Sequence, residues 1–476
     1  MAEILMIHPR EKRRVFGGMP PLGLGWVASY LEAKGYSVDF IDCQIDDRSF
    51  EDIIRSSAPR IIGITGTSHT RYSSFEIAQT AKRIDNKIFV VYGGSHATFT
   101  AEDTLNNVSG IDAIVIGEGE ETLHEIVHSV MRGNSNLDGI RGVSFRKAGT
   151  VSHNPQRLRI GNIDSLPLPA RHLMQINKYD LNMDFLNVPG TSIMSSRGCP
   201  INCSFCSASA MFGTSLSLRS AVHVVDEIEI LLKEYGFKGI KFFDSTLTLK
   251  KDHILSICEE IIRRQLKFPW ECEIRVNSVN KDILRTMKNA GCYYVDFGVE
   301  SVRPNVLRAM HKGITMEQVD NVFEWTSDLG LLTKVFFTFG HIQETLDDAM
   351  ATIDYIEQSK KQISFQAINV GIKIYPGTVV EKYAREIGCL KKGFSWVSPY
   401  FCKDSEFLRC DPSVPLLIQP QMGLSELKKI KFKLLWNRFR NPLNIIPAIK
   451  EAWDKDNLHK VWITAKGMVR TKIARD

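Results

Sequence analysis

The sequence lacks an uninterrupted apolar run long enough to span a bilayer, and its first nine residues lack a basic segment followed by an apolar stretch. These absences argue against a membrane span and against a secretory signal peptide. Residues 1–9 instead predict a first β-strand. The chain has 476 residues, of which 43% are hydrophobic and 24% charged. This length and composition are typical of a globular protein with two or three domains.

Cysteines that lie close together in the sequence are also few. Seven of the ten cysteines are dispersed along the chain, which is not the pattern of a secreted disulfide framework. We therefore expect a reducing, cytoplasmic compartment. The other three, Cys199, Cys203 and Cys206, have the spacing C-x3-C-x2-C. No second cysteine pair follows, as a tetrahedral zinc site would require. A zinc site and scattered core cysteines are therefore the weaker interpretations.

Three cysteines on one loop have a specific chemical use. They can hold three irons of a [4Fe–4S] cluster and leave the fourth iron open. An enzyme that must bind and reduce S-adenosylmethionine (SAM) needs such an open iron. The motif, with Phe205 directly before the third cysteine, resembles the signature of the radical SAM superfamily. The resemblance implies that one electron cleaves SAM, and that a 5′-deoxyadenosyl radical abstracts hydrogen from a substrate.

Residues 1–150 alternate short β-branched runs with amphipathic helical segments. This alternation predicts a flavodoxin-like, doubly wound α/β domain with helices on both faces of a parallel sheet. Ligands of such sheets bind beyond the carboxyl ends of the strands. The predicted ends carry small residues, at Gly63–Ser68, Gly93–Thr98 and Gly117–Glu120. No G-x-G-x-x-G motif is present, which argues against a nicotinamide dinucleotide.

This arrangement resembles the cobalamin-binding domain that precedes many radical SAM cores; an empty flavodoxin-like module is the alternative. The D-x-H-x-x-G motif that supplies a histidine to cobalt is absent, so we expect no protein histidine on the cobalt. His96 is interpreted as a packing histidine in preference to a cobalt ligand. The candidate cobalamin contacts are Pro21, Gly23, Thr65, Gly66, Thr67, Ser68, Gly93, Gly94, His96, Glu118, Gly119 and Glu120.

A methylthiotransferase that modifies transfer RNA is a second alternative for this domain. Such proteins hold a second cluster on three cysteines in the N-terminal domain. Only Cys43 lies upstream of Cys199, so this alternative fails on the number of ligands. We accordingly expect no nucleic-acid partner.

Residues 151–190 contain two prolines in Leu166–Arg171 and are predicted to form a linker. From 191 to 385, six strand–helix units predict an open (βα)6 barrel, two units short of a closed (βα)8 barrel. Catalytic loops of such barrels lie at the carboxyl ends of the strands. This partial barrel is similar to that of radical SAM enzymes.

The resemblance also implies SAM contacts at these strand ends. Asp244 and Ser245 lie where other members hold the methionine amino group, although a helix N-cap explains Asp244 equally well. Glu273 and Arg275 should point into the barrel, where they either pair with each other or contact the SAM carboxylate. Glu300 resembles a ribose contact. The candidate SAM contacts are Phe205, Asp244, Ser245, Arg275, Glu300 and Ser301.

One turn departs from the family pattern. Gly340-His-Ile-Gln-Glu-Thr345 stands in the place of a usual G-L-P-G-E-T turn. The missing proline and glycine indicate a different substrate loop.

Residues 386–476 are predicted to form a mainly helical C-terminal extension without recognisable family chemistry. From Leu424 onward there are 13 Lys and Arg residues against 5 Asp and Glu. The favoured interpretation is an ordinary helix with a solvated basic face. The alternative is a peripheral contact with the inner face of the membrane, through an interfacial helix on anionic lipid. Its apolar side would consist of Phe432, Leu435, Trp436 and Phe439, and its bases would be Lys431, Lys433, Arg438 and Arg440.

Together these observations predict a cobalamin-dependent radical SAM enzyme with a [4Fe–4S] cluster, SAM and cobalamin as cofactors. The leading reaction is methylation of an unactivated carbon of a bulky, largely apolar substrate, through a 5′-deoxyadenosyl radical and methylcobalamin. An electron donor such as flavodoxin or ferredoxin is expected. A non-methylating cyclase or rearrangement enzyme is one alternative. A cobalamin- or cluster-binding sensor without turnover is an alternative of another class.

Overall fold

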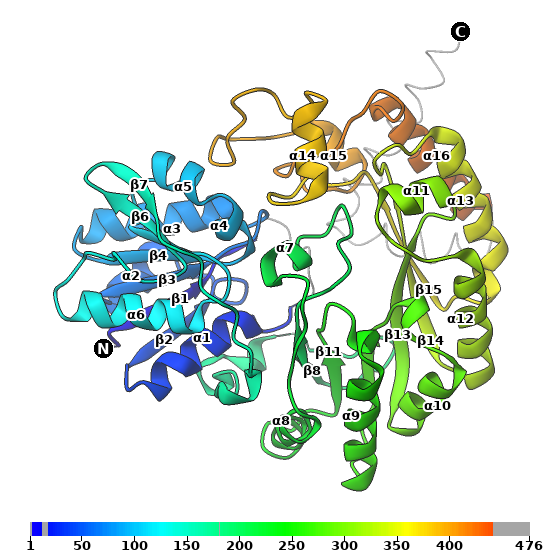
Figure 1. Ribbon diagram of the computed structural model, residues 1–476, viewed down its shortest axis with the longest axis horizontal. Coiled ribbons are helices and arrows are strands. Elements are labelled where there is room, and N and C mark those ends of the chain that lie inside the picture. Colours follow the sequence, from blue (N-terminus) through cyan, green and yellow to red (C-terminus); the bar gives the residue numbers. More distant parts are fainter. Residues whose placement is uncertain (1, 12–17, 180, 441–476) are drawn as a thin grey trace.

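The computed structural model describes residues 2–11, 18–179 and 181–440. Figure 1 shows two α/β units side by side, the first in blue and cyan and the second in green and yellow. A C-terminal extension, in orange, lies across the top of both units. The arrangement follows the order of the predicted parts along the chain.

The first unit is built on a seven-stranded sheet with the order β2-β1-β3-β4-β5-β6-β7. The first five strands are parallel, which confirms the doubly wound prediction. The strands are β1 (Ile4–His8), β2 (Val38–Asp42), β3 (Ile61–Thr65), β4 (Phe89–Gly93), β5 (Ala113–Val115), β6 (Val143–Lys147) and β7 (Thr150–His153).

The last two strands correct the expectation of a parallel sheet. β6 pairs antiparallel with β5, and β7 pairs antiparallel with β6. The two-residue turn between β6 and β7 consists of Ala148 and Gly149, both at positive φ (48° and 82°), as a tight hairpin turn requires. Alanine is an unusual residue for this conformation, so the turn carries little sequence signal. The sheet therefore ends at His153, three residues beyond the predicted domain boundary.

Helices cover both faces of this sheet, because alternate side chains of each strand point to opposite faces. Leu5 and Ile7 of β1 pack with one set of helices, and Ile4 and Met6 pack with the other. The first set comprises α2 (Phe50–Ser57), α3 (Arg71–Ile84), α4 (Ser95–Phe99) and α5 (Ala101–Asn107), and the second comprises α1 (Leu22–Ala33) and α6 (Glu120–Met131).

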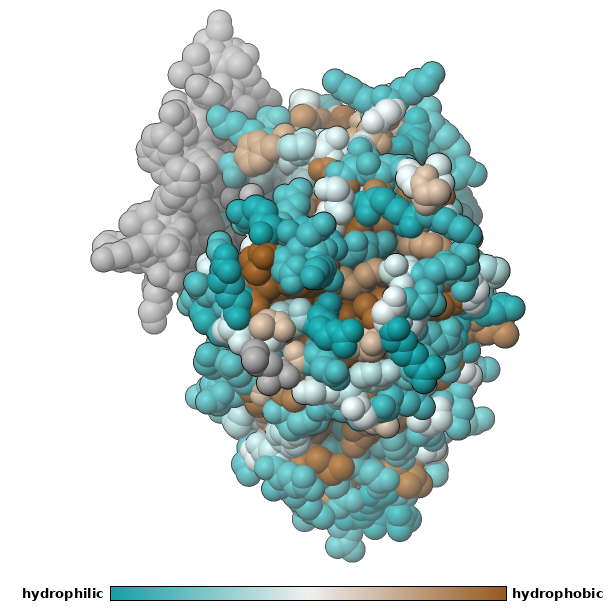
Figure 2. Space-filling model, turned by 90° about the vertical axis from the view of Figure 1, so that its left-hand side faces the viewer, coloured by the Kyte–Doolittle hydropathy of each residue, from teal (hydrophilic) through white to brown (hydrophobic). Residues whose placement is uncertain are grey.

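Figure 2 views this first unit from the side turned away from the second unit. The surface is mostly hydrophilic, with hydrophobic residues gathered near the middle of the face. The cavities described below lie on the other side, toward the second unit.

The second unit is a six-stranded, fully parallel sheet with the order β15-β14-β13-β12-β11-β8. The first and last strands are not paired with each other, which confirms the open (βα)6 barrel. Its strands are β8 (Gly190–Ile193), β11 (Gly239–Phe242), β12 (Trp270–Glu273), β13 (Cys292–Glu300), β14 (Leu332–Phe339) and β15 (Phe365–Val370). Its outer helices are α8 (Ala221–Lys233), α9 (Lys251–Arg263), α10 (Lys281–Asn289), α11 (Pro304–Ala309), α12 (Met316–Leu329) and α13 (Leu346–Gln358).

The predicted linker is anchored to both units. Its Tyr179 hydroxyl donates to Asp42 of the first unit at 2.6 Å, and its other contacts described here are with the barrel. Arg171 is buried and pairs with Glu227 of α8 at 2.9 Å. The Tyr293 hydroxyl donates to the Asp184 carbonyl at 2.6 Å, and the Phe185 ring lies 5.0 Å from the Tyr294 ring. These contacts place residues 184–185 against the barrel strand β13.

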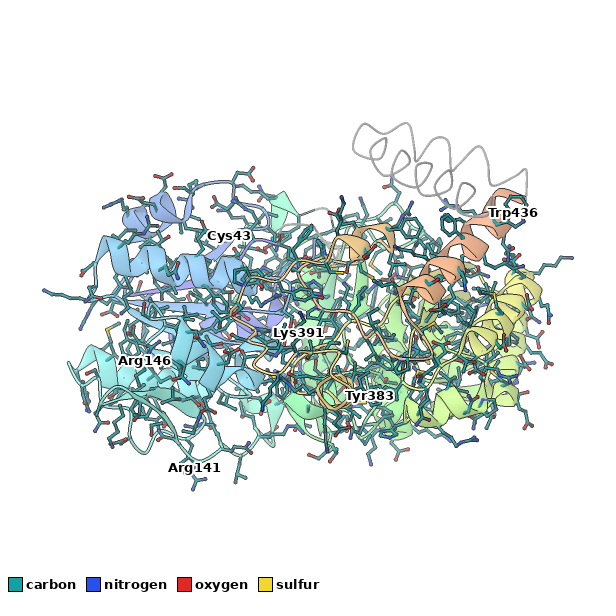
Figure 3. All side chains as sticks on the ribbon, turned by 90° about the horizontal axis from the view of Figure 1, so that it is seen from above. Cys43, Arg141, Arg146, Tyr383, Lys391 and Trp436 are labelled. Atoms are coloured by element: carbon teal, nitrogen blue, oxygen red, sulfur yellow. The ribbon has the colours of Figure 1, made fainter. Side chains whose placement is uncertain are left out.

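The C-terminal extension joins the two units. It follows α14 (Val379–Glu386), the last helix of the barrel region, and contains α15 (Lys403–Phe407) and α16 (Leu424–Arg440). Its Trp396 amide donates to Asp103 of α5 at 2.6 Å, and Arg71 donates from Nε to the Trp396 carbonyl at 3.0 Å. In Figure 3 the labelled Lys391 of this extension lies over the middle of the molecule, between the two units.

Helix α16 packs partly against the extension, as the favoured interpretation of an ordinary helix allows. The Phe432 ring packs 5.3 Å from the Phe407 ring, so part of the apolar face is turned inward. Trp436 is 67% exposed and lies at the far end of the helix (Figure 3). The side chains of Phe439 and Arg440 lie outside the described residues. Within the described residues, no helix has both the length and the apolar character that a membrane crossing needs.

Candidate cofactor and active site

The three clustered cysteines lie on a loop between β9 (Ser196–Arg197) and α7 (Ala208–Phe212). Other parts of the chain fix this loop. The Ser204 amide donates to the Met310 carbonyl at 3.0 Å, and the Val380 amide donates to the Ser204 carbonyl at 3.0 Å. His311 contacts the Asn202 carbonyl at 3.1 Å. The loop is therefore held by the segment after α11 and by the start of α14.

The thiols fit a cluster better than a single ion. Burial raises the pKa of Cys199, and the neighbouring Cys203 adds to that rise. Across the described part of the chain, no three His, Cys, Asp or Glu side chains are close enough to hold a single metal ion. A zinc ion needs all its ligands around one point, whereas a [4Fe–4S] cluster offers each cysteine its own iron.

Asp244 binds the segment that leads into the cysteine loop. Its carboxylate accepts hydrogen bonds from the Ser195 amide at 3.1 Å, the Ser195 hydroxyl at 2.8 Å and the Ser196 hydroxyl at 2.5 Å. The N-cap interpretation is wrong, because α9 begins after Lys250. Asp244 therefore positions the segment before Cys199, and its contact with the SAM amino group stays a prediction. Ser245, next to it, is exposed at the carboxyl end of β11.

Arg275 is a buried cation beside the cluster loop. It is 8% exposed, and its Nε has no hydrogen-bond partner among the residues that the structure describes. Burial raises the pKa of Cys199, and the positive charge of Arg275 opposes this rise. The predicted ion pair with Glu273 is not formed. The Glu273 side chain is exposed. Partial desolvation by the protein around it, together with the nearby Asp296, raises its pKa to about 7.

Glu300 ends β13 in a strained conformation, with φ at +67° beside a register shift. Such strain persists only where surrounding contacts hold it. Its Oε1 accepts from Lys312 at 3.1 Å, and its Oε2 accepts from the Thr338 hydroxyl at 2.8 Å. The Ser301 hydroxyl accepts from the Arg303 amide at 3.2 Å, so it serves the local turn.

The unusual turn after β14 brings His341 close to Thr338, the hydrogen-bond partner of Glu300, and to Phe205 of the cluster loop. His341 is fully buried, and burial lowers its pKa to about 3, so its ring is neutral. The ring contacts Thr338 through Nε2 at 2.5 Å and lies 5.2 Å from the Phe205 ring of the cluster loop. Sequence reasoning missed this residue, although the replacement of the usual proline was a visible signal.

A first cavity, the sheet cavity, lies between the first sheet and helices α1 and α6. The space unfilled by atoms is about 770 Å³, including the part open to solvent. A Cβ added at Gly23 or Gly117 would meet nothing within 4 Å, whereas one at Gly94 (φ +96°) would lie 2.8 Å from the Gly66 carbonyl oxygen. Seven predicted contacts line this cavity: Gly23, Thr65, Gly93, Gly94, Glu118, Gly119 and Glu120.

A second cavity, the junction cavity, opens between the two units and has about 980 Å³ of unfilled space. Two residues, Gly23 and Met194, line both cavities, so the two spaces adjoin. The first unit contributes His8, Pro20, Pro21 and Thr67, the linker contributes Tyr179, and the barrel contributes Ser192, Met194 and Phe243. The glycine-rich walls of the sheet cavity and the apolar walls of the junction cavity suit a large planar cofactor with a side arm.

The remaining predicted cobalamin contacts line neither of these two cavities. A Cβ on Gly66 would lie 2.3 Å from the Tyr92 hydroxyl oxygen, so packing explains this glycine. His96 is 1% exposed. Its Nδ1 shares a hydrogen bond with the Ser68 hydroxyl at 3.0 Å, and its ring packs edge-on against the Trp396 ring, with 5.7 Å between the ring centroids. These contacts favour the packing interpretation of His96.

Glu118 and Glu120 have a second role that the sequence did not reveal. Both pair with Arg197, directly before the cluster loop, at 2.8 and 2.7 Å. Arg197 also lies 4.8 Å above the Trp26 ring. Burial alone lowers the pKa of Arg197, but Glu120 and Glu118 together raise it above its ordinary value. This buried ion pair joins the sheet cavity to the cluster loop.

Comparisons with known proteins agree with this geometry. The family described as the B12 binding domain matches residues 13–127, and the Radical SAM superfamily matches residues 193–356. An uncharacterized methyltransferase of Pyrococcus horikoshii is 37% identical over 390 residues, covering 81% of this chain and 83% of that protein. The anaerobic magnesium-protoporphyrin IX monomethyl ester cyclase of Rubrivivax gelatinosus is 30% identical over 360 residues, covering 72% of this chain and 63% of that protein.

A solved structure shares the fold. The radical SAM methyltransferase TsrM from Kitasatospora setae, with tryptophan substrate and a SAM analogue bound, has a TM-score of 0.67 at 20% identity. The match covers 83% of this chain and 77% of that one. The chain described here therefore belongs to the cobalamin-dependent radical SAM enzymes, whose cofactors are a [4Fe–4S] cluster, SAM and cobalamin.

Proposed function

We propose that this enzyme methylates an unactivated carbon of a bulky, largely apolar small molecule. The observation that carries the proposal is the meeting of the two cavities at Gly23 and Met194. A methyl donor held by the first unit and a carbon held against the barrel would share one space there. The two units are fixed in this relation by the C-terminal extension and by Arg197.

Residues of the chain fit the three cofactors. Cys199, Cys203 and Cys206 would hold the cluster, Arg275 offers an unpaired cation to the SAM carboxylate, and Glu300 offers oxygens to ribose hydroxyls. The glycine-rich strand ends of the first sheet would hold cobalamin. When bound, the cluster and SAM supply a 5′-deoxyadenosyl radical, and cobalamin supplies the methyl group.

The walls of the junction cavity support an apolar substrate. Apolar side chains make up most of its lining on both units, and Phe243 is 48% exposed into open space beside it. Such walls exclude water, which protects a reactive carbon radical from side reactions. The apolar lining residues are Met19, Pro20, Pro21, Leu22, Ile45, Met194 and Phe243.

Two partners complete the proposal. A one-electron donor such as flavodoxin or ferredoxin is needed, because cleavage of SAM consumes an electron. A peripheral contact between α16 and anionic lipid would deliver an apolar substrate, supported by the exposed Trp436 and by Lys433, which is also exposed.

A non-methylating cyclase is the second candidate, and the identity to the Rubrivivax gelatinosus cyclase favours it. The two candidates and a sensor without turnover give different products. The test is anaerobic incubation of the reconstituted enzyme with methyl-deuterated SAM, reductant, hydroxocobalamin and candidate tetrapyrroles or terpenoid lipids, followed by mass analysis. The control variant carries alanine at Cys199, Cys203 and Cys206.

Methylation predicts S-adenosylhomocysteine, 5′-deoxyadenosine and a substrate that carries the deuterated methyl group. 5′-Deoxyadenosine with an unmethylated, altered substrate would identify a cyclase or rearrangement enzyme. A chain that binds both cofactors but forms no 5′-deoxyadenosine with any substrate would be a sensor. Iron and broad visible absorption that persist in the triple alanine variant would refute the cluster assignment.

A further inference from the structure

His8, the last residue of β1, has a buried carboxylate behind its ring. Its Nδ1 lies 2.8 Å from Oδ1 of Asp42, whose side chain is 2% exposed. The other carboxylate oxygen accepts from the Tyr179 hydroxyl at 2.6 Å, and the Gln44 amide donates to Oδ1 at 2.9 Å. Burial alone raises the pKa of Asp42, but His8, Tyr179 and Gln44 together hold it below its ordinary value. Asp42 is therefore a fixed anion.

This arrangement leaves the second ring nitrogen of His8 available. A carboxylate at Nδ1 favours the tautomer whose proton lies on Nδ1, and in that tautomer Nε2 carries the lone pair. Nε2 has no hydrogen-bond partner among the described residues, and the side chain is 22% exposed and lines the junction cavity. Histidines that bind metals almost always donate their other N–H to a carboxylate or carbonyl, which orients the ring and raises its basicity.

His8 lies at the end of the sheet where this fold binds planar cofactors, so the metal that it can reach is the one that such a cofactor carries. The strand order β2-β1-β3-β4-β5 reverses direction between β1 and β3. Planar cofactors of this fold bind at that switch point, beyond the carboxyl ends of the strands. His8 ends β1, and Thr67 follows the end of β3 by two residues; both line the same cavity.

We propose that Nε2 of His8 binds the cobalt of cobalamin from the side of the sheet, with Asp42 and Tyr179 as positioning residues. The inference rests on cobalamin binding in the proposed function, and it replaces the expectation of a cobalt without a protein histidine. Two other histidines lie near the strand ends. His96 has no hydrogen-bond partner at Nε2 among the described residues, but it is 1% exposed and lines neither cavity. His69 contacts Asp411 at 2.7 Å and Tyr375 at 3.1 Å through its two ring nitrogens.

The test uses the full chain loaded with hydroxocobalamin and reduced to the cob(II)alamin state. Electron paramagnetic resonance should show each axial line split into a triplet by one nitrogen. In protein labelled at histidine with nitrogen-15, and loaded with unlabelled cofactor, the triplet should become a doublet. This measurement needs no variant, so a folding defect cannot obscure it.

Variants locate the nitrogen. His8→Ala should lose the splitting, and Asp42→Asn should weaken histidine ligation by about ten- to a hundredfold, as loss of the partner of a metal-bound histidine does. His172→Ala, which changes an exposed histidine paired with Glu32, should leave the spectrum unchanged.

Three outcomes would overturn the inference. A triplet that survives nitrogen-15 labelling comes from the cofactor's own base. Cobalamin that is retained without any nitrogen splitting leaves His8 with a packing or substrate role. Splitting that persists in a folded His8→Ala variant belongs to another histidine. A chain that retains no cobalamin at all would instead refute the proposed function, and the inference with it.

Discussion

Replacing Arg197 by methionine leaves two buried carboxylates without their cation. The side chains of Glu118 and Glu120 are 7% and 4% exposed, and that of Arg197 is 5% exposed. Removing one partner of a buried ion pair costs about 3–5 kcal/mol, because the remaining charge is left desolvated. We expect a loss of that size in the free energy of unfolding of the apoprotein.

The matched control is Arg55→Met. Arg55 pairs with Glu51 at 2.8 Å, the same distance as Arg197 to Glu118, but the two side chains are 59% and 49% exposed. Exposed pairs of this kind contribute about 0.3–0.5 kcal/mol. Equal distances with unequal burial therefore separate the effect of desolvation from that of the ion pair itself.

Urea unfolding followed in parallel by circular dichroism and tryptophan fluorescence measures both variants, and Trp26 beneath Arg197 is a local reporter. Coincident transitions are required before a single free energy is assigned. Adding Glu118→Gln and Glu120→Gln to Arg197→Met should recover most of the loss, since no buried charge remains. The reasoning fails if Arg197→Met costs no more than Arg55→Met, or if the neutral triple variant recovers nothing.

Three further predictions concern other parts of the chain. Asp244→Asn should lower the iron bound after anaerobic reconstitution although all three cysteines remain, because the Ser195 and Ser196 donors lose their anion; iron content equal to wild type would contradict this. Burial raises the pKa of Glu344 to about 7 from 4.5, so the native state holds an extra proton between these values. Stability should therefore fall by up to about 1.4 kcal/mol per pH unit across that window, and Glu344→Gln should flatten the slope in urea titrations at pH 5 to 8. Helix α16 should bind anionic liposomes at low salt, with about 1 kcal/mol from each base near the surface; co-sedimentation unchanged by charge reversal of the four bases named above would remove the membrane contact.

Local patterns explain why much of the fold was predictable. The five parallel strands of the first unit and the six strands of the barrel follow from runs of buried β-branched residues, whose spacing depends on neighbours in sequence. The cluster cysteines were predictable for the same reason, since all three ligands lie within eight residues. The antiparallel hairpin β6–β7 was not predicted, because its turn depends on a positive φ at Ala148.

The predicted SAM and cobalamin contacts were harder to assign, because a residue type does not reveal its partner. Asp244 at a strand end suits a SAM contact or a helix cap equally well, yet the fold directs it to Ser195 and Ser196. Glu118 and Glu120 lie at the predicted strand end, but their carboxylates are bound by Arg197. The assignments of individual contacts and the domain boundaries remain predictions.

The sequence alone determined the cofactor class, the order of the two units and their strands, since each depends on short motifs or on periodicity. Only the tertiary structure decided which distant side chains meet. His8, Asp42 and Tyr179 form one hydrogen-bonded set, although Asp42 lies 34 residues from His8 and 137 residues from Tyr179 in the sequence. The same holds for the 293 residues between Asp103 and Trp396. Such pairs form because the docking of the units buries polar groups that must find partners, and no local pattern in the chain records which partner the docking brings near.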